Sequence, residues 1–194
     1  MFNGKNVFVN GFVFWLAITG ICSASASNNL GVHVHGLAFF QVAVENNTVV
    51  TQLQSPSINF LGFERQPKKK SEIDHINRIE SILKSAQIYK FIGSNCNLIK
   101  SNFELQTISS HKLPTESHDH SHGHDHETDD VENSHREIMV YHKFICGNTK
   151  ALKALDVFLF DEFPQVEKIN AEWVSESKQG KTSLTRKNFK INLD

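Results

Sequence analysis

A histidine-rich stretch in the second half of the chain constrains the fold more than any other feature. Residues 106–134 lack hydrophobic periodicity, and five histidines there alternate with aspartate, serine and glycine: His118, His120, His122, His124 and His126. Such a polar segment cannot supply a hydrophobic core. Loops this long within a domain are usually functional or disordered. We therefore predict a disordered His/Asp-rich loop at residues 106–134, and a core built from the sequence on either side.

The composition of this loop predicts metal binding. Neutral imidazole is a good ligand for zinc, copper and nickel, and the carboxylates of Asp119 and Asp125 can attract or complete a site. Ordering the loop costs roughly 1 to 2 kcal/mol of backbone entropy per residue, so we expect modest affinity and several bound ions. Calcium held by aspartates such as Asp129 and Asp130 would leave the histidines unexplained. Zinc is the expected ion, with copper or nickel as alternatives.

The N-terminus predicts export. Lys5 precedes a short apolar run at residues 12–18, and small residues then end in Ala24-Ser25-Ala26. This order is typical of a signal peptide at residues 1–26, whose cleavage would also remove Cys22. The apolar run is short for a membrane anchor, so we expect no stable membrane insertion after cleavage. Residues 27–194 then have the length of a single domain.

The two cysteines that remain, Cys96 and Cys146, predict one disulfide. An even cysteine count in an oxidising compartment favours a bridge. In the chain-entropy model, closing a loop of this length stabilises the fold by roughly 3 to 4 kcal/mol. Thiolate metal ligands would require more cysteines at closer spacing.

Alternating apolar residues predict an α+β domain, mostly antiparallel β-sheet with one main helix packed on it. Strands are expected at residues 32–45, 49–55, 96–105, 137–146, 169–173 and 189–193. We expect the main helix to be capped by Ser71, with a second, short helix at 149–155 and a turn at 179–181. His75 is interpreted as a surface residue and His142 as a core histidine. The net charge of −1 disfavours nucleic-acid binding.

A second candidate metal site is the pair His33 and His35. If the first strand already includes these residues, positions i and i+2 place both imidazoles on one face, where they could share an ion. Two histidines at a strand edge are also common as ordinary polar surface.

Several motifs in one order resemble a known family. They are His33-Val34-His35-Gly36, the segment SPSINFLGFE at 55–64, two cysteines flanking a histidine-rich insertion, and FDEFP at 160–164. In this order the chain resembles the ZrgA-like zinc-regulated periplasmic zinc-binding proteins. It departs from their pattern at Val34, where an acidic residue is frequent, and at Arg65, where a histidine often stands.

The resemblance implies a periplasmic protein that captures zinc through the loop and assists its uptake. The expected partners are zinc ions and a zinc ABC transporter or its binding protein, and His33 and His35 are implied as further ligands. A metal buffer or protective sink, or a partner-binding module, is the alternative. No His-Glu-x-x-His helix, Gly-x-Ser-x-Gly elbow or phosphate-binding glycine loop is present, so we expect no enzymatic activity.

Overall fold

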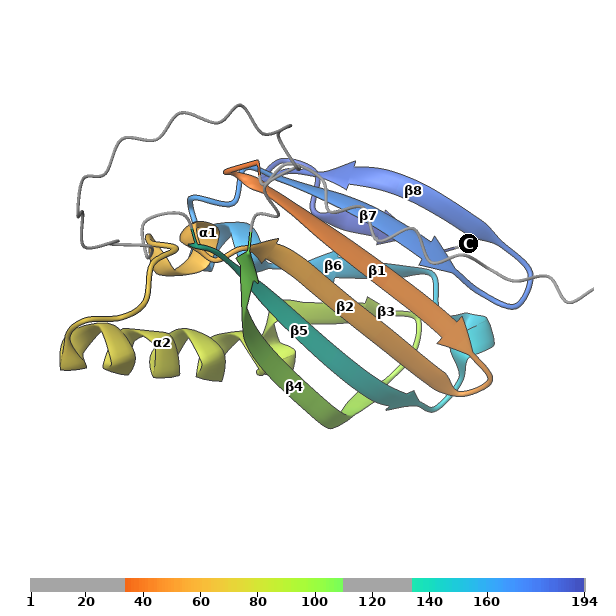
Figure 1. The fold of residues 1–194 in the computed structure, drawn as a ribbon. Helices are drawn as coiled ribbons and strands as arrows, with labels where there is room; N and C mark the ends of the chain where they lie inside the picture. The colour runs from red at the N-terminus through yellow and green to blue at the C-terminus, as the bar shows by residue number, and fades with distance from the viewer. Residues whose placement is uncertain (1–33, 110–133, 194) are drawn as a thin grey trace, which may run out of the picture. The chain divides into compact units, whose positions relative to one another are not determined.

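A large β-sheet carries the fold of the computed structural model, which describes residues 34–109 and 134–193. Its strands, in spatial order, are β4 (Cys96–Ser109), β5 (Ser134–Cys146), β2 (Thr48–Pro56), β1 (Leu37–Glu45), β7 (Lys168–Val174) and β8 (Gln179–Leu184) (Figure 1). Side chains alternate between a buried and an exposed face, as in β1, where Ala38, Phe40 and Val42 are buried. The strands expected at 32–45 and 49–55 are present as β1 and β2, which pair antiparallel in a hairpin.

The sheet is mixed. β1 and β7 run parallel, with Phe40 opposite Ala171, whereas every other neighbouring pair in the sheet is antiparallel. Parallel strands need a long crossover connection, and here the chain forms β2 to β6 before it returns as β7. The expectation of a mostly antiparallel α+β fold is thus met in its coarse outline.

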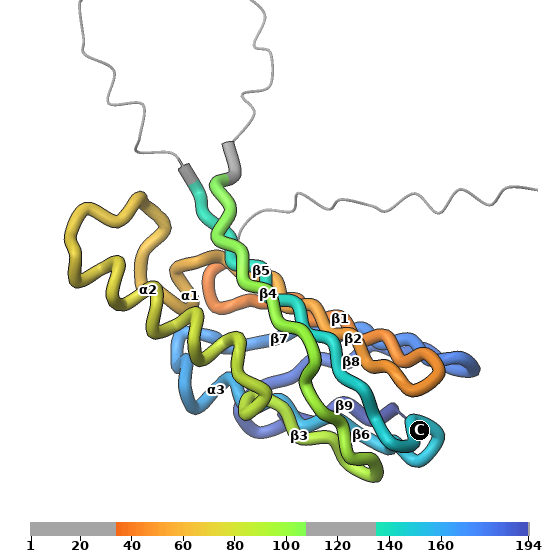
Figure 2. Tube along the Cα trace, turned by 90° about the horizontal axis from the view of Figure 1, so that it is seen from below, coloured from red at the N-terminus to blue at the C-terminus, as the bar shows by residue number. Residues whose placement is uncertain are grey.

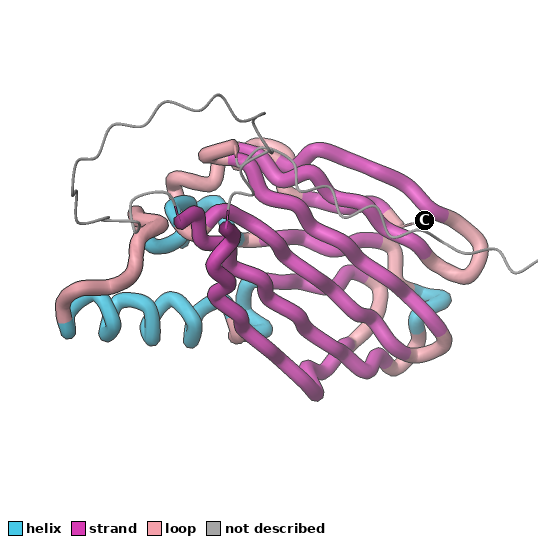
Figure 3. Tube along the Cα trace, in the orientation of Figure 1, coloured by secondary structure: helices cyan, strands magenta, loops and turns pink. Residues whose placement is uncertain are grey.

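A second layer covers the buried face of the large sheet. It contains a small antiparallel sheet, β3 (Tyr89–Ile92), β6 (Ala154–Val157) and β9 (Lys190–Asn192), beside α1 (Ile58–Leu61), α2 (Lys70–Leu83) and α3 (Leu159–Glu162). In Figure 2 these three strands lie together next to the C-terminal end of α2, and in Figure 3 strands dominate the described chain. Phe40, Leu53 and Phe144 from the large sheet form one core with Leu155 and Leu159 from this layer.

The main helix begins two residues earlier than a cap at Ser71 would place it. α2 starts at Lys70, and the cap is supplied by Glu72, whose Oε2 accepts hydrogen bonds from the amides of Lys68 (2.7 Å) and Lys69 (3.2 Å). Ser71 lies inside the first turn, so the predicted cap is wrong. A carboxylate in the first turn also interacts favourably with the helix dipole. The apolar face is confirmed where Ile79 and Leu83 enter the core.

Two secondary-structure predictions in the C-terminal half are wrong, the helix at 149–155 and the turn at 179–181. Residues 149–155 form a single 3₁₀ turn, η2 (Thr149–Ala151), followed by strand β6, because Leu155 belongs to the buried centre of the small sheet. Gly180 lies within β8 opposite Trp173, and a Cβ atom there would come within 2.8 Å of the indole ring. This glycine therefore admits a cross-strand aromatic side chain and does not make a turn.

The disulfide is confirmed between directly opposite residues of β4 and β5, Cys96 and Cys146. From this bridge the two strands pair along their length to Ser109 and Ser134. The strands therefore extend into the segment that we expected to be a loop. Residues 110–133 lie outside the described part of the chain.

His142 lies at the centre of the core. It is fully buried in β5, with its ring edge-on to Tyr89 (centroids 5.3 Å apart) and directly across from Thr51. Neither ring nitrogen has a hydrogen-bond partner of good geometry among the described residues. Burial lowers the pKa of His142, and the nearby carbonyls of Lys84 and Leu83 oppose this only in part. The imidazole is therefore held in its neutral form.

This burial predicts acid sensitivity of the fold. In the unfolded chain the imidazole takes up a proton near its ordinary pKa of 6.5, while in the folded protein its lowered pKa resists protonation. Stability present above pH 6.5 is then lost as the pH falls toward the folded pKa, with a slope of at most about 1.4 kcal/mol per pH unit. Urea unfolding of His142→Leu should lose less stability on acidification than the wild type, and a His75→Leu surface control should match the wild type. Parallel pH profiles for all three proteins would contradict this assignment.

Substituting Arg136 is expected to leave the free energy of unfolding unchanged or to increase it. Its side chain is buried, burial lowers its pKa, and Nε and Nη1 have no hydrogen-bond partner among the described residues. Replacing a buried, incompletely compensated charge with an apolar residue is often neutral or stabilises a protein by about 1 to 4 kcal/mol. Denaturant unfolding of Arg136→Met should therefore show equal or higher stability. A clear loss, absent from an exposed Arg78→Met control, would reveal a charge partner for Arg136.

Candidate metal centre

Three segments far apart in sequence bring two histidines to one carboxylate. His135 Nδ1 lies 2.8 Å from Glu64 Oε2, and His35 Nε2 lies 3.5 Å from Glu64 Oε1. His35 precedes β1, Glu64 follows α1, and His135 is the second residue of β5. We call this group the His35–Glu64–His135 trio. In the sequence, His135 stands directly after the histidine-rich insertion, so the trio adjoins the point where the insertion rejoins the sheet.

The carboxylate of the trio is more buried than its histidines. The Glu64 side chain is 14% exposed, against 60% for His35 and 47% for His135. Glu64 Oε1 is shielded from solvent and accepts no hydrogen bond among the described residues. A desolvated anionic oxygen without a hydrogen bond is costly and attracts a cation. The two imidazoles beside this oxygen are themselves exposed to solvent.

The geometry of the trio is close to that of a zinc site, but no such site is already formed. Zinc ligands at about 2.0 to 2.2 Å in a tetrahedral arrangement lie about 3.3 Å from one another. The distance from His35 to Glu64 is near this value, and the hydrogen bond from His135 would have to open by about half an ångström. Within residues 34–109 and 134–193, no group of three or more His, Cys, Asp or Glu side chains is placed so that it could hold a metal ion as it stands, so zinc binding at the trio would require its side chains to move.

A tight turn positions His35. Residues 34–37 form this turn, in which the Leu37 amide donates to the Val34 carbonyl (3.1 Å) and Gly36 adopts a positive φ of 81°. His35 therefore lies before β1, and the prediction that a strand places it beside His33 by period two is wrong for His35. The turn requires a left-handed backbone conformation at position 36, and glycine adopts this conformation without strain. His33 lies outside the described residues.

Helix α1 connects all three parts of the trio. The side chain of Asn59 accepts from the Gly36 amide (2.8 Å) and donates to the Leu37 carbonyl (3.0 Å). Ser57 Oγ donates to the Phe63 carbonyl (2.8 Å), directly before Glu64, and the Ser57 amide donates to the Arg136 carbonyl (2.8 Å), directly after His135. One short helical turn thus holds the three backbone segments in place.

Arg65 is not part of the trio. Its guanidinium lies over the Phe63 ring, 5.2 Å from the centroid, and Nη1 donates to Glu72 Oε2 (3.1 Å). This hydrogen bond raises the pKa of Arg65, and it is the main cause that lowers the pKa of Glu72 to about 2. Where the resembled family often has a histidine, this chain has a cation that is engaged by the start of α2.

The predicted ligands of the insertion lie outside the described residues. These are His118, His120, His122, His124 and His126, with Asp119 and Asp125. Glu64 and His135 were missed by sequence reasoning. A signal for each was present, since Glu64 closes the quoted motif at 55–64 and His135 directly follows the insertion.

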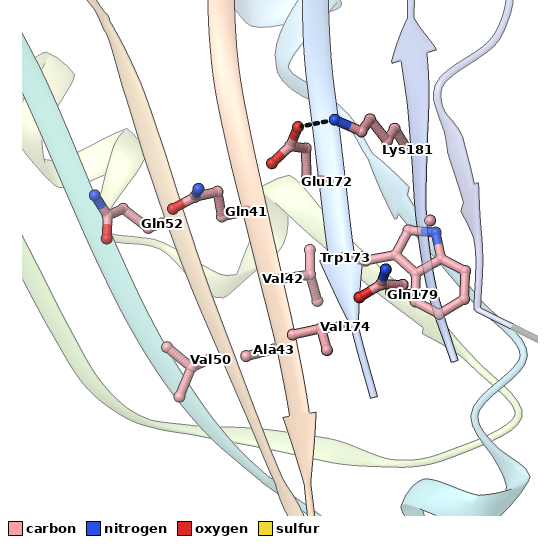
Figure 4. A pocket seen from close by; sticks show the side chains of 11 residues that line it. Gln41, Val42, Ala43, Val50, Gln52, Glu172, Trp173, Val174, Gln179 and Lys181 are labelled. Carbon is pink, nitrogen blue, oxygen red and sulfur yellow. Dashed lines mark hydrogen bonds and ion pairs between the residues drawn. The ribbon is translucent and has the colours of Figure 1, made fainter. Parts of the chain in front are cut away.

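A groove on the exposed face of the sheet is a different kind of surface. It has a volume of about 620 Å³ and crosses β2, β1, β7 and β8 (Figure 4). Its lining includes Gln41, Gln52 and Trp173, and its carboxylate Glu172 pairs with Lys181 at 3.0 Å. It contains no histidine or cysteine, so it offers no set of zinc ligands.

The fold and the trio together define a disulfide-linked, strand-rich domain with a histidine-carboxylate centre beside a histidine-rich insertion, a class suited to binding divalent metal. The model of the ZrgA family zinc uptake proteins matches residues 32–193, and the chain belongs to this family. Its role is accordingly related to zinc. None of the curated proteins matches the chain. In the described part of the chain, no helix is long and apolar enough to cross a membrane.

Proposed function

We propose that this chain is a periplasmic zinc-binding protein, without enzymatic activity, that captures zinc and assists its delivery to a transporter. The observation that carries the proposal is the buried carboxylate of Glu64 between two exposed imidazoles. Membership of a zinc uptake family and the Cys96–Cys146 disulfide support an exported location and zinc as the cargo.

The two groups of ligands suit different steps of capture. Five histidines in the insertion provide many weak, interchangeable sites that raise the local zinc concentration. The trio offers two nitrogens and one oxygen on backbone segments that the fold brings together, so only side-chain adjustment separates it from a zinc site. A site held by three protein ligands leaves a fourth position for water or for an incoming ligand. Zinc held there can be passed on when a transporter protein supplies that ligand.

Zinc calorimetry on the mature protein tests this proposal. We expect more than one zinc equivalent at about pH 7.5, and weaker binding at about pH 5.5, because ordinary imidazoles with a pKa near 6.5 become protonated in that interval. Absence of zinc binding above the buffer background would contradict the proposal. Equal binding at both pH values would contradict the role of histidine ligands.

A further inference from the structure

Asn59 is the one residue of α1 whose side chain reaches the turn that carries His35. It is almost fully buried, yet it is polar, and it makes three hydrogen bonds through its amide. Oδ1 accepts from the Gly36 amide at 2.8 Å, and Nδ2 donates to the Leu37 carbonyl at 3.0 Å and to Ser55 Oγ at 2.9 Å. The two backbone partners are the residues directly after His35.

These bonds fix a segment that has few other restraints. The His35 side chain is largely exposed, and the backbone of Gly36 has a left-handed conformation that an unsupported chain would readily leave. On the other side of the turn, the amides of Glu167 and Lys168 donate to the Gly36 carbonyl at 2.8 and 3.0 Å. The turn is therefore held between the start of β7 and Asn59, whose side chain hydrogen-bonds it from the side of α1.

We propose that Asn59 is the positioning residue of the metal centre, which fixes the imidazole of His35 opposite the Glu64 carboxylate. The inference rests on the proposed function, because it assumes that the trio binds zinc. Asn59 touches no ion itself. It acts by holding the backbone of Gly36 and Leu37. Residues that hold metal ligands in place commonly have this role, and substituting them lowers metal affinity about 10- to 100-fold.

The amide group suits this role better than other side chains of similar size. It must accept one backbone hydrogen bond and donate another, and asparagine does both without a charge. Aspartate could accept from Gly36 but could not donate to Leu37, and it would bury a charge. Leucine would leave both backbone groups buried and unpaired, at a cost of about 1 to 3 kcal/mol each.

A double-mutant cycle tests this inference in a full-length chain whose five insertion histidines are changed to serine, so that only the trio is measured. Zinc affinity is determined by competition with a chromophoric chelator for the parent, Asn59→Ala, His35→Ala and the double variant. We expect Asn59→Ala to weaken binding about 10- to 100-fold. Adding Asn59→Ala to His35→Ala should weaken binding no further, because the residue acts only through that histidine.

A general structural effect would give a different result. If Asn59→Ala loosened the whole domain, it would also weaken the zinc binding that Glu64 and His135 retain in the His35→Ala background, and the two effects would add. Additivity, or an affinity of Asn59→Ala within about twofold of the parent, overturns the inference. Asn102→Ala, which removes an exposed asparagine from β4, is the matched control and should bind like the parent.

Two other results are also informative, an Asn59→Ala variant that does not fold and a serine-substituted parent that binds no zinc. If Asn59→Ala does not fold, Ser55→Ala takes its place. Of the three Asn59 hydrogen bonds it removes only the 2.9 Å bond from Nδ2, together with the 3.3 Å bond from Ser55 Oγ to the Pro56 carbonyl, and it should give a smaller loss with the same non-additivity. Full affinity of Ser55→Ala in that case overturns the inference. A serine-substituted parent that binds no zinc overturns the trio as a zinc site and this inference with it, and the unsubstituted chain then shows whether zinc capture by the insertion still stands. Zinc binding at the trio that is indifferent to Asn59 overturns this inference alone.

Discussion

Changing Glu64 to glutamine is expected to abolish high-affinity zinc binding at the trio. The neutral amide keeps the size of the side chain and can still hydrogen-bond to His135, but it lacks the charge that a buried position makes effective. We expect the affinity of this site to fall at least about 100-fold, the upper end of what the loss of a more distant partner costs a metal site. Competition titration in the serine-substituted chain measures this directly.

The matched control for this substitution is Glu172→Gln. Glu172 is an exposed carboxylate on β7, paired with Lys181 in the groove of the outer face. The chemical change is identical, so any difference between the two variants reflects position and not charge alone. The metal-free Glu64→Gln protein should be as stable toward unfolding as the wild type or slightly more, because a solvent-shielded anionic oxygen that accepts no hydrogen bond has been removed. Wild-type zinc affinity in Glu64→Gln would refute a role of the trio.

Replacing the five insertion histidines with serine is expected to remove most of the bound zinc. The substituted residues are His118, His120, His122, His124 and His126. Serine cannot replace imidazole as a zinc ligand, whereas the trio retains its own ligands. Calorimetry should therefore show the multiple equivalents reduced to one. Thermal unfolding of the metal-free protein should remain nearly unchanged, because a polar segment without apolar residues supplies no hydrophobic core.

The control for this variant keeps the imidazoles and alters the neighbouring carboxylates. Asp119→Ser with Asp125→Ser should retain most zinc equivalents and lose part of their affinity, since these carboxylates assist but cannot replace five imidazoles. Unfolding of the domain in the five-serine variant would contradict the prediction that the insertion is functional and not structural. Retention of all zinc equivalents would contradict its role in capture.

The elements that could be predicted from sequence are those in which local pattern and tertiary environment agree. Period two in β1 and β2 and helical spacing in α2 reflect one buried face each, and an even cysteine count led to the Cys96–Cys146 bridge. Gly180 was misinterpreted as a turn residue. It is required because the Trp173 indole on the neighbouring strand approaches its backbone closely, and the residues next to Gly180 in the sequence do not reveal this contact. The short helix expected at 149–155 extended into the first two residues of β6, whose four consecutive buried residues show no strand periodicity.

The metal centre was predicted only in part for a similar reason. His35 was identified from the His-x-His pair, but its partners are distant in sequence, and His135 and Glu64 are 71 positions apart. Their encounter depends on α1, a single helical turn that sequence reasoning did not find, and on the Asn59 and Ser57 hydrogen bonds that attach it to β1 and β5. Contacts of this kind follow from the tertiary fold and leave no periodic signal in the sequence.

The measurement that tests the central claim most directly is anomalous diffraction at the zinc edge from crystals of the zinc-loaded, full-length mature chain. The account predicts a peak between His35 Nε2, His135 Nδ1 and the Glu64 carboxylate, with each ligand atom at about 2.0 to 2.2 Å. Ordered zinc bound elsewhere on residues 34–109 or 134–193, with the trio empty, would contradict it.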